Sequence, residues 1–283
     1  MRSRGFTLVE LIVVMAIVVL LTALSVPILQ HVRERARTVL CAGHVKQLLQ
    51  GLLNYQAGND AFPYGFHSSA GQLESPEHYA GIAGPIDLAG RWWFDYSQRI
   101  DHVTGDGVKL LTCPSRRQVG SLLSLDMLCG NYGANLSIFR VKQYAPPYEN
   151  GFSGDHPLPR EISRPAETLL LADSGYGLIS WWHATSEPPL RLPPPAFAPG
   201  GLQHGAYVPG MGINAGRILL PGQRDDAIGG RHPNRTVNVG FADGSAALKM
   251  ADALLVRKSQ DCWDNSPLWE PGGDTVTPQT STP

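Results

Sequence analysis

The dominant feature of the hydropathy pattern is a long apolar segment near the start of the chain. The nineteen residues of Leu11–Leu29 include no charged side chain, and arginines stand on both sides of them. As an α-helix, Phe6–Leu29 would be about 36 Å long at a rise of roughly 1.5 Å per residue, which is enough to cross a hydrocarbon core of about 30 Å. The pattern therefore predicts a membrane-spanning helix.

The pattern becomes amphipathic after this segment. Apolar side chains now recur at intervals of three and four residues, which places them on one face of a helix. They are Cys41, Val45, Leu48, Leu49 and Leu52. Gly58 has the conformational freedom that a helix end favours, and Pro27 removes one backbone hydrogen bond inside the helix. We therefore expect one helix over 6–56 that bends at Pro27 and packs its second half against the rest of the chain.

The body of the chain has short strand patterns separated by turn residues. The segment 167–173 is typical of a buried strand. In 237–250, alternating apolar residues precede Asp243-Gly244, which predicts a β-hairpin with a type I′ turn. We therefore expect an α+β fold, in which the long N-terminal helix packs on a mainly antiparallel β-sheet head with many loops over 57–270.

The composition agrees with a loop-rich head. The 31 glycines and 23 prolines are about one residue in five, against an average near 12%. Six prolines lie in 187–201, which predicts an extended exposed loop, and the polar Pro/Thr-rich segment 271–283 is typical of a disordered tail. With 23 basic and 24 acidic side chains the formal net charge is −1, which argues against a nucleic-acid partner.

A carboxylate, Glu10, lies one turn into the apolar helix. Inside a membrane it would cost roughly 2–3 kcal/mol without a partner, so Glu10 is a candidate functional residue. The residues around it, Arg4-Gly5-Phe6-Thr7-Leu8-Val9-Glu10, resemble the processing site of type IV prepilins and type II secretion pseudopilins.

This resemblance implies how the chain matures and assembles. A prepilin peptidase in the inner membrane would remove the leader 1–5 by cutting between Gly5 and Phe6, and would methylate the new N-terminus. Glu10 would become the fifth mature residue and Pro27 the twenty-second. Glu10 would then pair with the N-terminal amine of a neighbouring subunit, since two buried charges are tolerable only as a pair. The resemblance implies a pilin-like fold and a structural subunit of a pilus or pseudopilus.

The expected topology places the N-terminus in the bacterial cytoplasm and the head in the periplasm, or on a surface filament after assembly. Arg33, Arg35 and Arg37 outnumber Arg2 and Arg4 of the leader, which by itself favours the opposite orientation. We follow the processing motif because it is the more specific signal.

The competing hypothesis is a single-pass membrane anchor that never assembles and carries a periplasmic binding domain or a hydrolase. The tryptophans in Trp92-Trp93 and Trp181-Trp182, with Trp263 and Trp269, would suit a glycan-binding surface, although tryptophan is more often a core residue. Ser174, His232 and Asp243 have the residue types of a hydrolase triad, but no nucleophile-elbow pattern surrounds Ser174. We therefore expect no enzymatic activity.

Further stretches resemble one branch of prepilin-like proteins, abundant in Planctomycetes and Verrucomicrobia, whose domain is described by a His followed nine residues later by Asp-Gly. These stretches are Cys41–Leu48, Leu111–Ser115, Asn131–Asn135, Pro165–Ser174, Arg231-His232 and Phe241–Gly244. Here ten residues separate His232 from Asp243, and we expect a loop at Pro233-Asn234 to absorb the extra one. We expect Asp173 and Asp243 to serve turns, and His232 to bond backbone near the sheet edge.

No cofactor is predicted from residue spacing. Asp225, Asp226 and Asp243 offer the hard oxygen atoms that calcium prefers, but they do not have calcium-loop spacing. The four cysteines and nine histidines show no zinc spacing such as Cys-x-x-Cys.

The four cysteines permit three disulfide pairings, and a periplasmic location permits oxidation. Cys113–Cys129 closes the shortest loop and is the first expectation, followed by Cys41–Cys262, which would tie the helix to the C-terminal region. Buried free thiols are the alternative.

Overall fold

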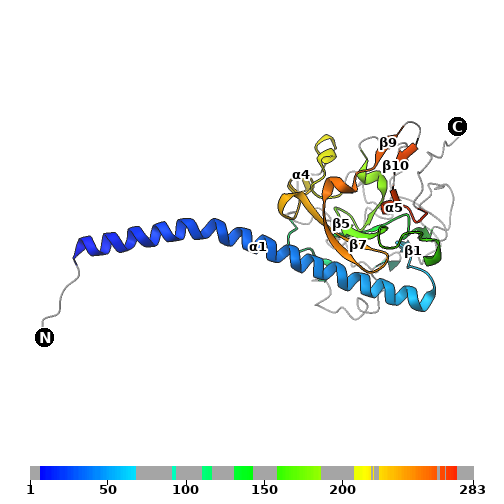
Figure 1. Ribbon diagram of the computed structural model, residues 1–283, viewed down its shortest axis with the longest axis horizontal. Helices are drawn as coiled ribbons and strands as arrows, with labels where there is room; N and C mark the ends of the chain where they lie inside the picture. Colours follow the sequence, from blue (N-terminus) through cyan, green and yellow to red (C-terminus); the bar gives the residue numbers. More distant parts are fainter. Residues whose placement is uncertain are drawn as a thin grey trace, which may run out of the picture.

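The computed structural model describes residues 7–67, 91–93, 110–116, 131–142, 158–185, 207–217, 219, 223–259, 262–264 and 266–272. In this part of the chain one long helix, α1, projects from a β-sheet head and packs against it along its C-terminal half (Figure 1). The predicted α+β arrangement is therefore confirmed. The proline-rich segment 187–201 and the tail beyond Gly272 lie outside the described residues.

The helix α1 extends over Leu8–Asn59 and is 52 residues long. It continues through Pro27, and Figure 1 shows it as gently curved rather than broken. The residue that ends it is Asp60, whose φ of 53° is left-handed, so the prediction of Gly58 for this role is wrong. Aspartate tolerates the left-handed region better than most residues, which removes the need for a glycine here.

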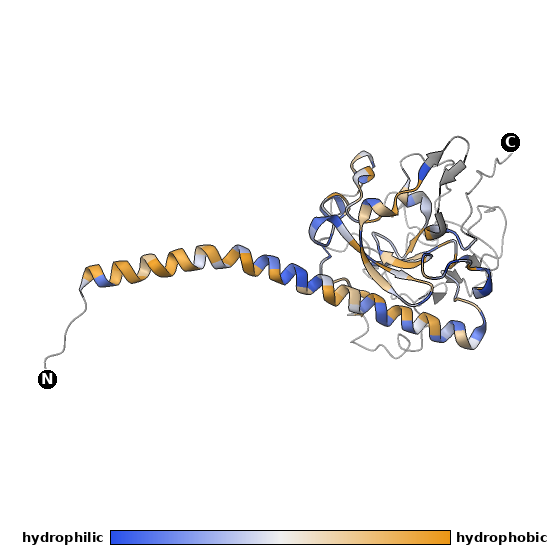
Figure 2. Cartoon of the chain, in the orientation of Figure 1, coloured by the Kyte–Doolittle hydropathy of each residue, from blue (hydrophilic) through white to orange (hydrophobic). Residues whose placement is uncertain are grey.

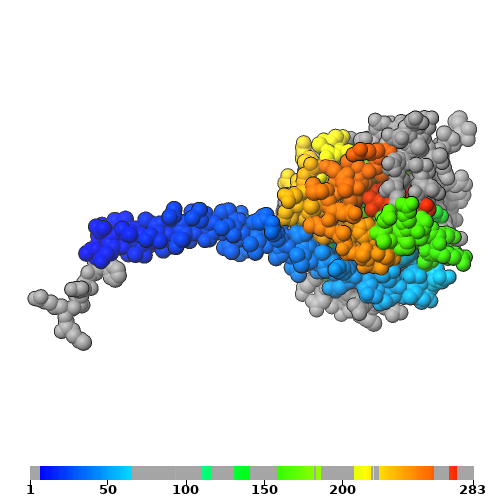
Figure 3. All heavy atoms as spheres, viewed as in Figure 1, coloured from blue at the N-terminus to red at the C-terminus, as the bar shows by residue number. Residues whose placement is uncertain are grey.

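The first half of α1 is not covered by the head. The large apolar side chains from Leu8 to Leu29 are 47–73% exposed. Figure 2 shows this half as almost uniformly hydrophobic, and Figure 3 shows it standing clear of the head. The helix is long and apolar enough to cross a membrane, as the hydropathy pattern predicts.

The second half of α1 packs against the sheet through one face. The apolar side chains that were predicted to share this face are all 0% exposed: Cys41, Val45, Leu48, Leu49 and Leu52. They join one hydrophobic core with residues of the head, among them Trp93 and Phe139. The amphipathic pattern therefore located the contact between α1 and the head.

The main sheet has five strands in the order β6-β3-β5-β7-β8. Their bounds are β3 Tyr132–Asn135, β5 Leu169–Asp173, β6 Leu178–Ile179, β7 Thr236–Phe241 and β8 Ala246–Met250. The pairing of β3 with β6 is parallel, and the other three pairings are antiparallel. The predicted strand at 167–173 is β5, and all five of its residues are buried.

Smaller elements complete the described part of the head. The short strands are β1 Phe66–His67, β2 Arg91–Trp92, β4 Val141–Lys142, β9 Arg257–Ser259 and β10 Cys262–Asp264. The short α-helices are α4 Arg224–Gly229 and α5 Ser266–Trp269. The 3-10 helices are η3 Pro159–Glu161, η4 Trp181–Ala184, η6 Gly212–Gly216, η8 Pro233–Arg235 and η9 Ala251–Leu254.

Strands β7 and β8 form the predicted hairpin, but the turn is not of type I′. Gly244 has a φ of 87°, whereas Asp243 is outside the left-handed region that a type I′ turn requires. The amide of Gly244 donates to Phe241 O at 3.0 Å, and the amide of Phe241 donates to Ser245 O at 2.9 Å. The loop therefore has three residues and ends in a left-handed glycine, an arrangement that needs positive φ only at Gly244.

The alternation of β7 decides how closely α1 approaches the sheet. Val237, Val239 and Phe241 belong to a second core, on the side of β7 away from α1. Gly240 faces α1, and a Cβ atom added to it would lie only 2.7 Å from Leu49 Cδ1. The helix therefore rests on the backbone of β7 at a position that has no side chain.

The substitution Gly240→Val should lower the free energy of unfolding by about 1–3 kcal/mol, because the new side chain overpacks the α1–β7 contact. Urea unfolding of the detergent-solubilised protein, followed by circular dichroism, measures the change. Gly43→Val is the control, since an added Cβ at Gly43 meets no atom within 4 Å. Equal midpoints for the two variants would contradict the packing of Leu49 on Gly240.

Candidate functional site

The N-terminal end of α1 is the first candidate site. Thr7 is the N-cap: the amide of Glu10 donates to Thr7 Oγ1 at 3.3 Å, and the amide and hydroxyl of Thr7 each donate to Glu10 Oε2 at 2.8 Å. This reciprocal capping box gives the Glu10 carboxylate partners within its own chain. Sequence reasoning assigned no role to Thr7, although Thr-x-x-Glu is the spacing of a capping box. Gly5 and Phe6 lie outside the described residues.

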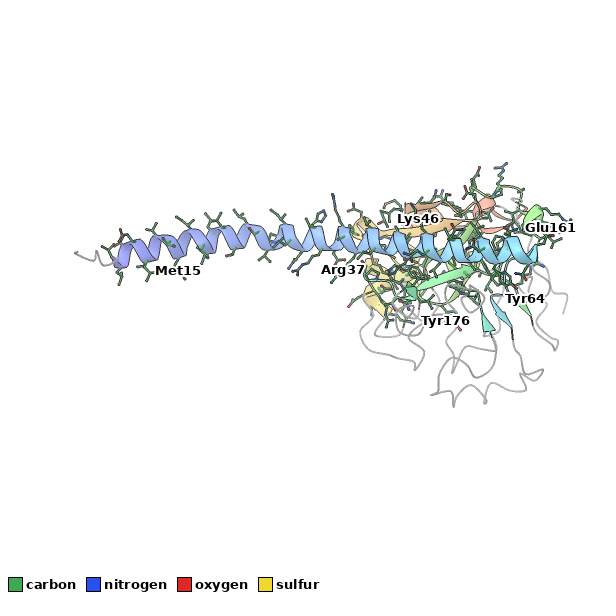
Figure 4. The ribbon with its side chains drawn as sticks, turned by 90° about the horizontal axis from the view of Figure 1, so that it is seen from below. Met15, Arg37, Lys46, Tyr64, Glu161 and Tyr176 are labelled. Atoms are coloured by element: carbon green, nitrogen blue, oxygen red, sulfur yellow. The ribbon has the colours of Figure 1, made fainter. Side chains whose placement is uncertain are left out.

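The second candidate site is a polar cluster beneath the C-terminal half of α1, where the helix lies across the head (Figure 4). Cys41 Sγ lies 3.2 Å from each of three atoms: Cys113 Sγ, Tyr132 Oη and Asp173 Oδ1. These side chains come from α1, the segment 110–116, β3 and the end of β5. All of them are 2% exposed or less.

The imidazole of His232 completes this cluster and connects it to α1. His232 Nε2 lies 3.1 Å from Asp173 Oδ2 and 2.9 Å from Asn238 Nδ2. On the other side of the ring, Nδ1 lies 3.2 Å from the hydroxyl oxygen of Thr38, which is on α1. Asp173 Oδ2 also accepts a hydrogen bond of 2.6 Å from the amide of Asn238 in β7.

The neighbouring Arg231 is also fully buried and has a separate set of partners. Its Nε lies 3.0 Å from both carboxylate oxygens of Asp226, and Tyr207 Oη donates to Asp226 Oδ2 at 2.9 Å. Its two terminal nitrogens donate to the carbonyl oxygens of Asn131 and Ser174. Because a buried guanidinium needs such a complete set of acceptors, Arg231 ties α4 to the ends of β3 and β5.

The cluster changes the protonation of its members. The hydrogen bond with Cys41 lowers the pKa of the Cys113 thiol to about 6, and the contact with His232 adds to this shift. Burial opposes a charge on His232, but its contacts with Asp173 and Cys113 raise its pKa to about 9. Burial raises the pKa of the Cys41 thiol. Burial would also raise the pKa of Asp173, but its hydrogen bond and charge interaction with His232 outweigh this effect and lower it. These shifts favour a negative charge on Cys113 and Asp173 and a positive charge on His232, and they oppose ionisation of Cys41.

The predicted disulfides are wrong. Cys41 and Cys113 are free thiols in the structure, and their Sγ atoms lie 3.2 Å apart. Loop length alone favours Cys113–Cys129, whereas the packing of α1 on the head brings Cys41 to Cys113. Cys129 and the side chain of Cys262 lie outside the described residues.

The calcium candidates are not brought together. Asp226 is buried and its carboxylate is occupied by Arg231, so it is not a loop ligand. Asp225 and Asp226 are in α4, which precedes β7, whereas Asp243 follows β7 in the hairpin turn. A six-residue strand thus separates the two groups.

His232 and Asp243 are also kept apart, because they lie before and after β7. Ser174, the third residue of the candidate hydrolase triad, donates its hydroxyl proton to Tyr176 O. Asp243 serves a turn, as predicted, by accepting from the amide of Ser245 at 2.8 Å. The predictions that Asp173 serves a turn and that His232 bonds backbone are wrong, because both belong to the buried cluster. The irregular backbone lies where it was expected, with Asn234 at a φ of 58°.

The tryptophans with described side chains do not form a binding surface. Trp93, Trp181 and Trp269 are 4% exposed or less. The indole of Trp93 donates to Gly177 O at 2.7 Å, and that of Trp269 donates to Leu254 O at 2.9 Å. These three are core residues. The side chains of Trp92, Trp182 and Trp263 lie outside the described residues.

A family model described as the prokaryotic N-terminal methylation motif matches residues 1–26. No curated protein and no solved structure matches the chain. The match marks the chain as a prepilin-type substrate of prepilin peptidase, and it agrees with the resemblance found around Glu10.

The substitution Asp173→Asn should lower the free energy of unfolding by about 3–5 kcal/mol, because it leaves the charge of His232 buried without its partner. Thermal and urea unfolding near neutral pH measure this loss. Asp225→Asn changes an exposed aspartate of α4 and should alter stability by less than about 0.5 kcal/mol. Similar stabilities of the two variants would show that the cluster contributes nothing to folding.

Proposed function

We propose that this protein is a structural subunit, a pilin or pseudopilin, of a type IV pilus or a type II secretion-like filament. The observation that carries the proposal is the N-terminal half of α1, which is apolar on all sides, is uncovered by the head and lies largely within the methylation motif of residues 1–26. A surface of this kind is stable only in a membrane or against other apolar helices.

Maturation would begin with cleavage between Gly5 and Phe6 and methylation of the new N-terminus. Before assembly the uncovered half of α1 would span the inner membrane, with its N-terminus in the cytoplasm and the head in the periplasm. In the filament the same surface would pack against the helices of neighbouring subunits. The proposed partners are therefore prepilin peptidase, the inner membrane and other pilin or pseudopilin subunits.

Glu10 would direct this packing through a change of partners. In a single subunit the carboxylate accepts hydrogen bonds from Thr7, so its charge is partly compensated. The amine of a neighbouring Phe6 would supply a full opposite charge, and an ion pair inside apolar surroundings gives the helices a preferred register. The stretch of α1 from Leu8 to Thr38, the first helix residue buried against the head, would be about 45 Å long at a rise of 1.5 Å per residue, so the head would lie outside an apolar layer of about 30 Å.

We also infer that the chain belongs to the branch with the His-x9-Asp-Gly domain. The support is that four of the stretches that resemble this branch each supply one side chain to the buried cluster: Cys41, Cys113, Asp173 and His232.

The first test is the N-terminus of the protein purified from its native membrane. We expect mass spectrometry to find a chain that begins at Phe6 and carries one added methyl group. The matched control is Gly5→Leu, which should keep the full leader because the peptidase requires the small residue before the cut. An intact Met1 in the wild type, or cleavage after the apolar segment, would rule out prepilin processing.

The second test separates assembly from processing. Glu10→Ala should still be cleaved and methylated, but its recovery in sheared filaments or crosslinked membrane oligomers should fall at least about tenfold, because the ion pair is lost. Glu34→Ala is the control, since Glu34 lies on the same helix and pairs with Arg37 on the surface. Wild-type recovery of Glu10→Ala would remove the pairing from the mechanism.

A further inference from the structure

Four metal-binding side chains meet where α1 crosses the head. They are Cys41 from α1, Cys113 from the segment 110–116, Asp173 from the end of β5 and His232 from the residue before η8. One ligand atom of each, a sulfur, an oxygen or a ring nitrogen, lies within 4.8 Å of the ligand atoms of the other three. All four residues are buried.

The hydrogen bonds around His232 determine which nitrogen faces the cluster. The hydroxyl of Thr38 donates its proton to Glu34 O at 2.9 Å, so Thr38 Oγ1 accepts from His232 Nδ1. Nδ1 therefore carries a proton, and in a neutral ring Nε2 has a lone pair. Nε2 lies 3.1 Å from Asp173 Oδ2 and 2.9 Å from Asn238 Nδ2, so a metal ion bound at Nε2 would also lie within reach of the carboxylate. Metal-binding histidines are held in this way, by donating their other ring N–H.

The hydrogen bonding beside the cluster is incomplete. The buried Oδ1 of Asn238 has no hydrogen-bond partner among the described atoms, although its Nδ2 lies 2.9 Å from His232 Nε2. A buried amide oxygen without a donor is costly. Exchange of the amide oxygen and nitrogen places Oδ1 where it can accept from a proton on His232 Nε2.

The donor set identifies the class of ion. Two thiols with an imidazole and a carboxylate suit zinc and similar thiophilic divalent ions, whereas calcium and magnesium prefer oxygen. In a tetrahedral zinc site the ligand atoms lie about 2.0–2.3 Å from the metal, so shifts of under about 1 Å would convert the observed cluster. A disulfide between Cys41 and Cys113 would account for only two of the four groups and would take from Asp173 Oδ1 its hydrogen bond with the Cys41 thiol.

We propose that Cys41, Cys113, Asp173 and His232 form a structural site for zinc, which fastens α1 to the head. The ion takes the place of the thiol protons of Cys41 and Cys113 and of any proton on His232 Nε2, and these protons pass to solvent. With four protein ligands, all buried, the site is closed to substrate and has no catalytic position. The proposal goes beyond the filament function and does not depend on it.

The experiment measures metal in the full chain, purified in detergent without chelator or His-tag. Inductively coupled plasma mass spectrometry should find about one zinc ion per chain in the wild type and in the control Cys262→Ser. Cys41→Ser and His232→Gln should each contain less than about a tenth of that amount. Removal of zinc by a chelator should lower the melting temperature of the wild type, and added zinc should restore it. Equal zinc contents in Cys41→Ser and Cys262→Ser would place the metal elsewhere and overturn the proposal.

A second measurement, on the wild type alone, covers the case in which the variants do not fold. Cobalt(II) added to the reduced, metal-free protein should produce the absorption bands of tetrahedral cobalt bound to thiolate. Absence of these bands, with both thiols free, would show a purely protonated polar cluster. A peptide that links Cys41 to Cys113 in the protein as isolated, found without reduction, would show a disulfide instead. Either outcome overturns the zinc site and leaves the filament function unaffected.

Discussion

The packing of α1 on β7 is the contact on which the rest of the structure depends. One face of the second half of the helix is buried, and it reaches the strand backbone at Gly240, where Leu49 fills the space that a side chain would occupy. The helix has no break between this contact and the uncovered apolar half. Any movement of the apolar half is therefore transmitted to the head through a continuous helix rather than through a flexible linker.

Polar groups hold this contact in one arrangement. Leu48, Leu49 and Leu52 would tolerate small shifts of the helix along the sheet, because apolar contacts are not directional. The cluster of Cys41, Asp173 and His232 does not tolerate them, since each group is buried and needs its partner at hydrogen-bond distance. The combination gives α1 both adhesion to the head and a defined position on it.

The two halves of α1 meet opposite requirements of solvation. The second half is covered by its own head, whereas the first half needs a membrane or neighbouring helices to remove its apolar side chains from water. Glu10 is the polar exception in the first half, and the capping box with Thr7 supplies local hydrogen bonds for it. A filament subunit requires this combination, because its helix must be soluble in the membrane and still recognise another helix.

The sequence by itself determined the features that depend on neighbouring residues. Periodicity located α1 and its buried face, a continuous apolar run located β5, alternation located the β7–β8 hairpin, and a short motif predicted the processing site. Local rules failed at chain turns, where several residue types can adopt the required backbone conformation. The helix therefore ends at Asp60 and not at Gly58, and the hairpin turn has one residue more than predicted. Only the tertiary structure decided the cluster, because Cys41 is 72 residues from Cys113 and 132 residues from Asp173. Spacing rules detect ligands that are close in the chain, and these four side chains are brought together only by the packing of α1 across the ends of the strands.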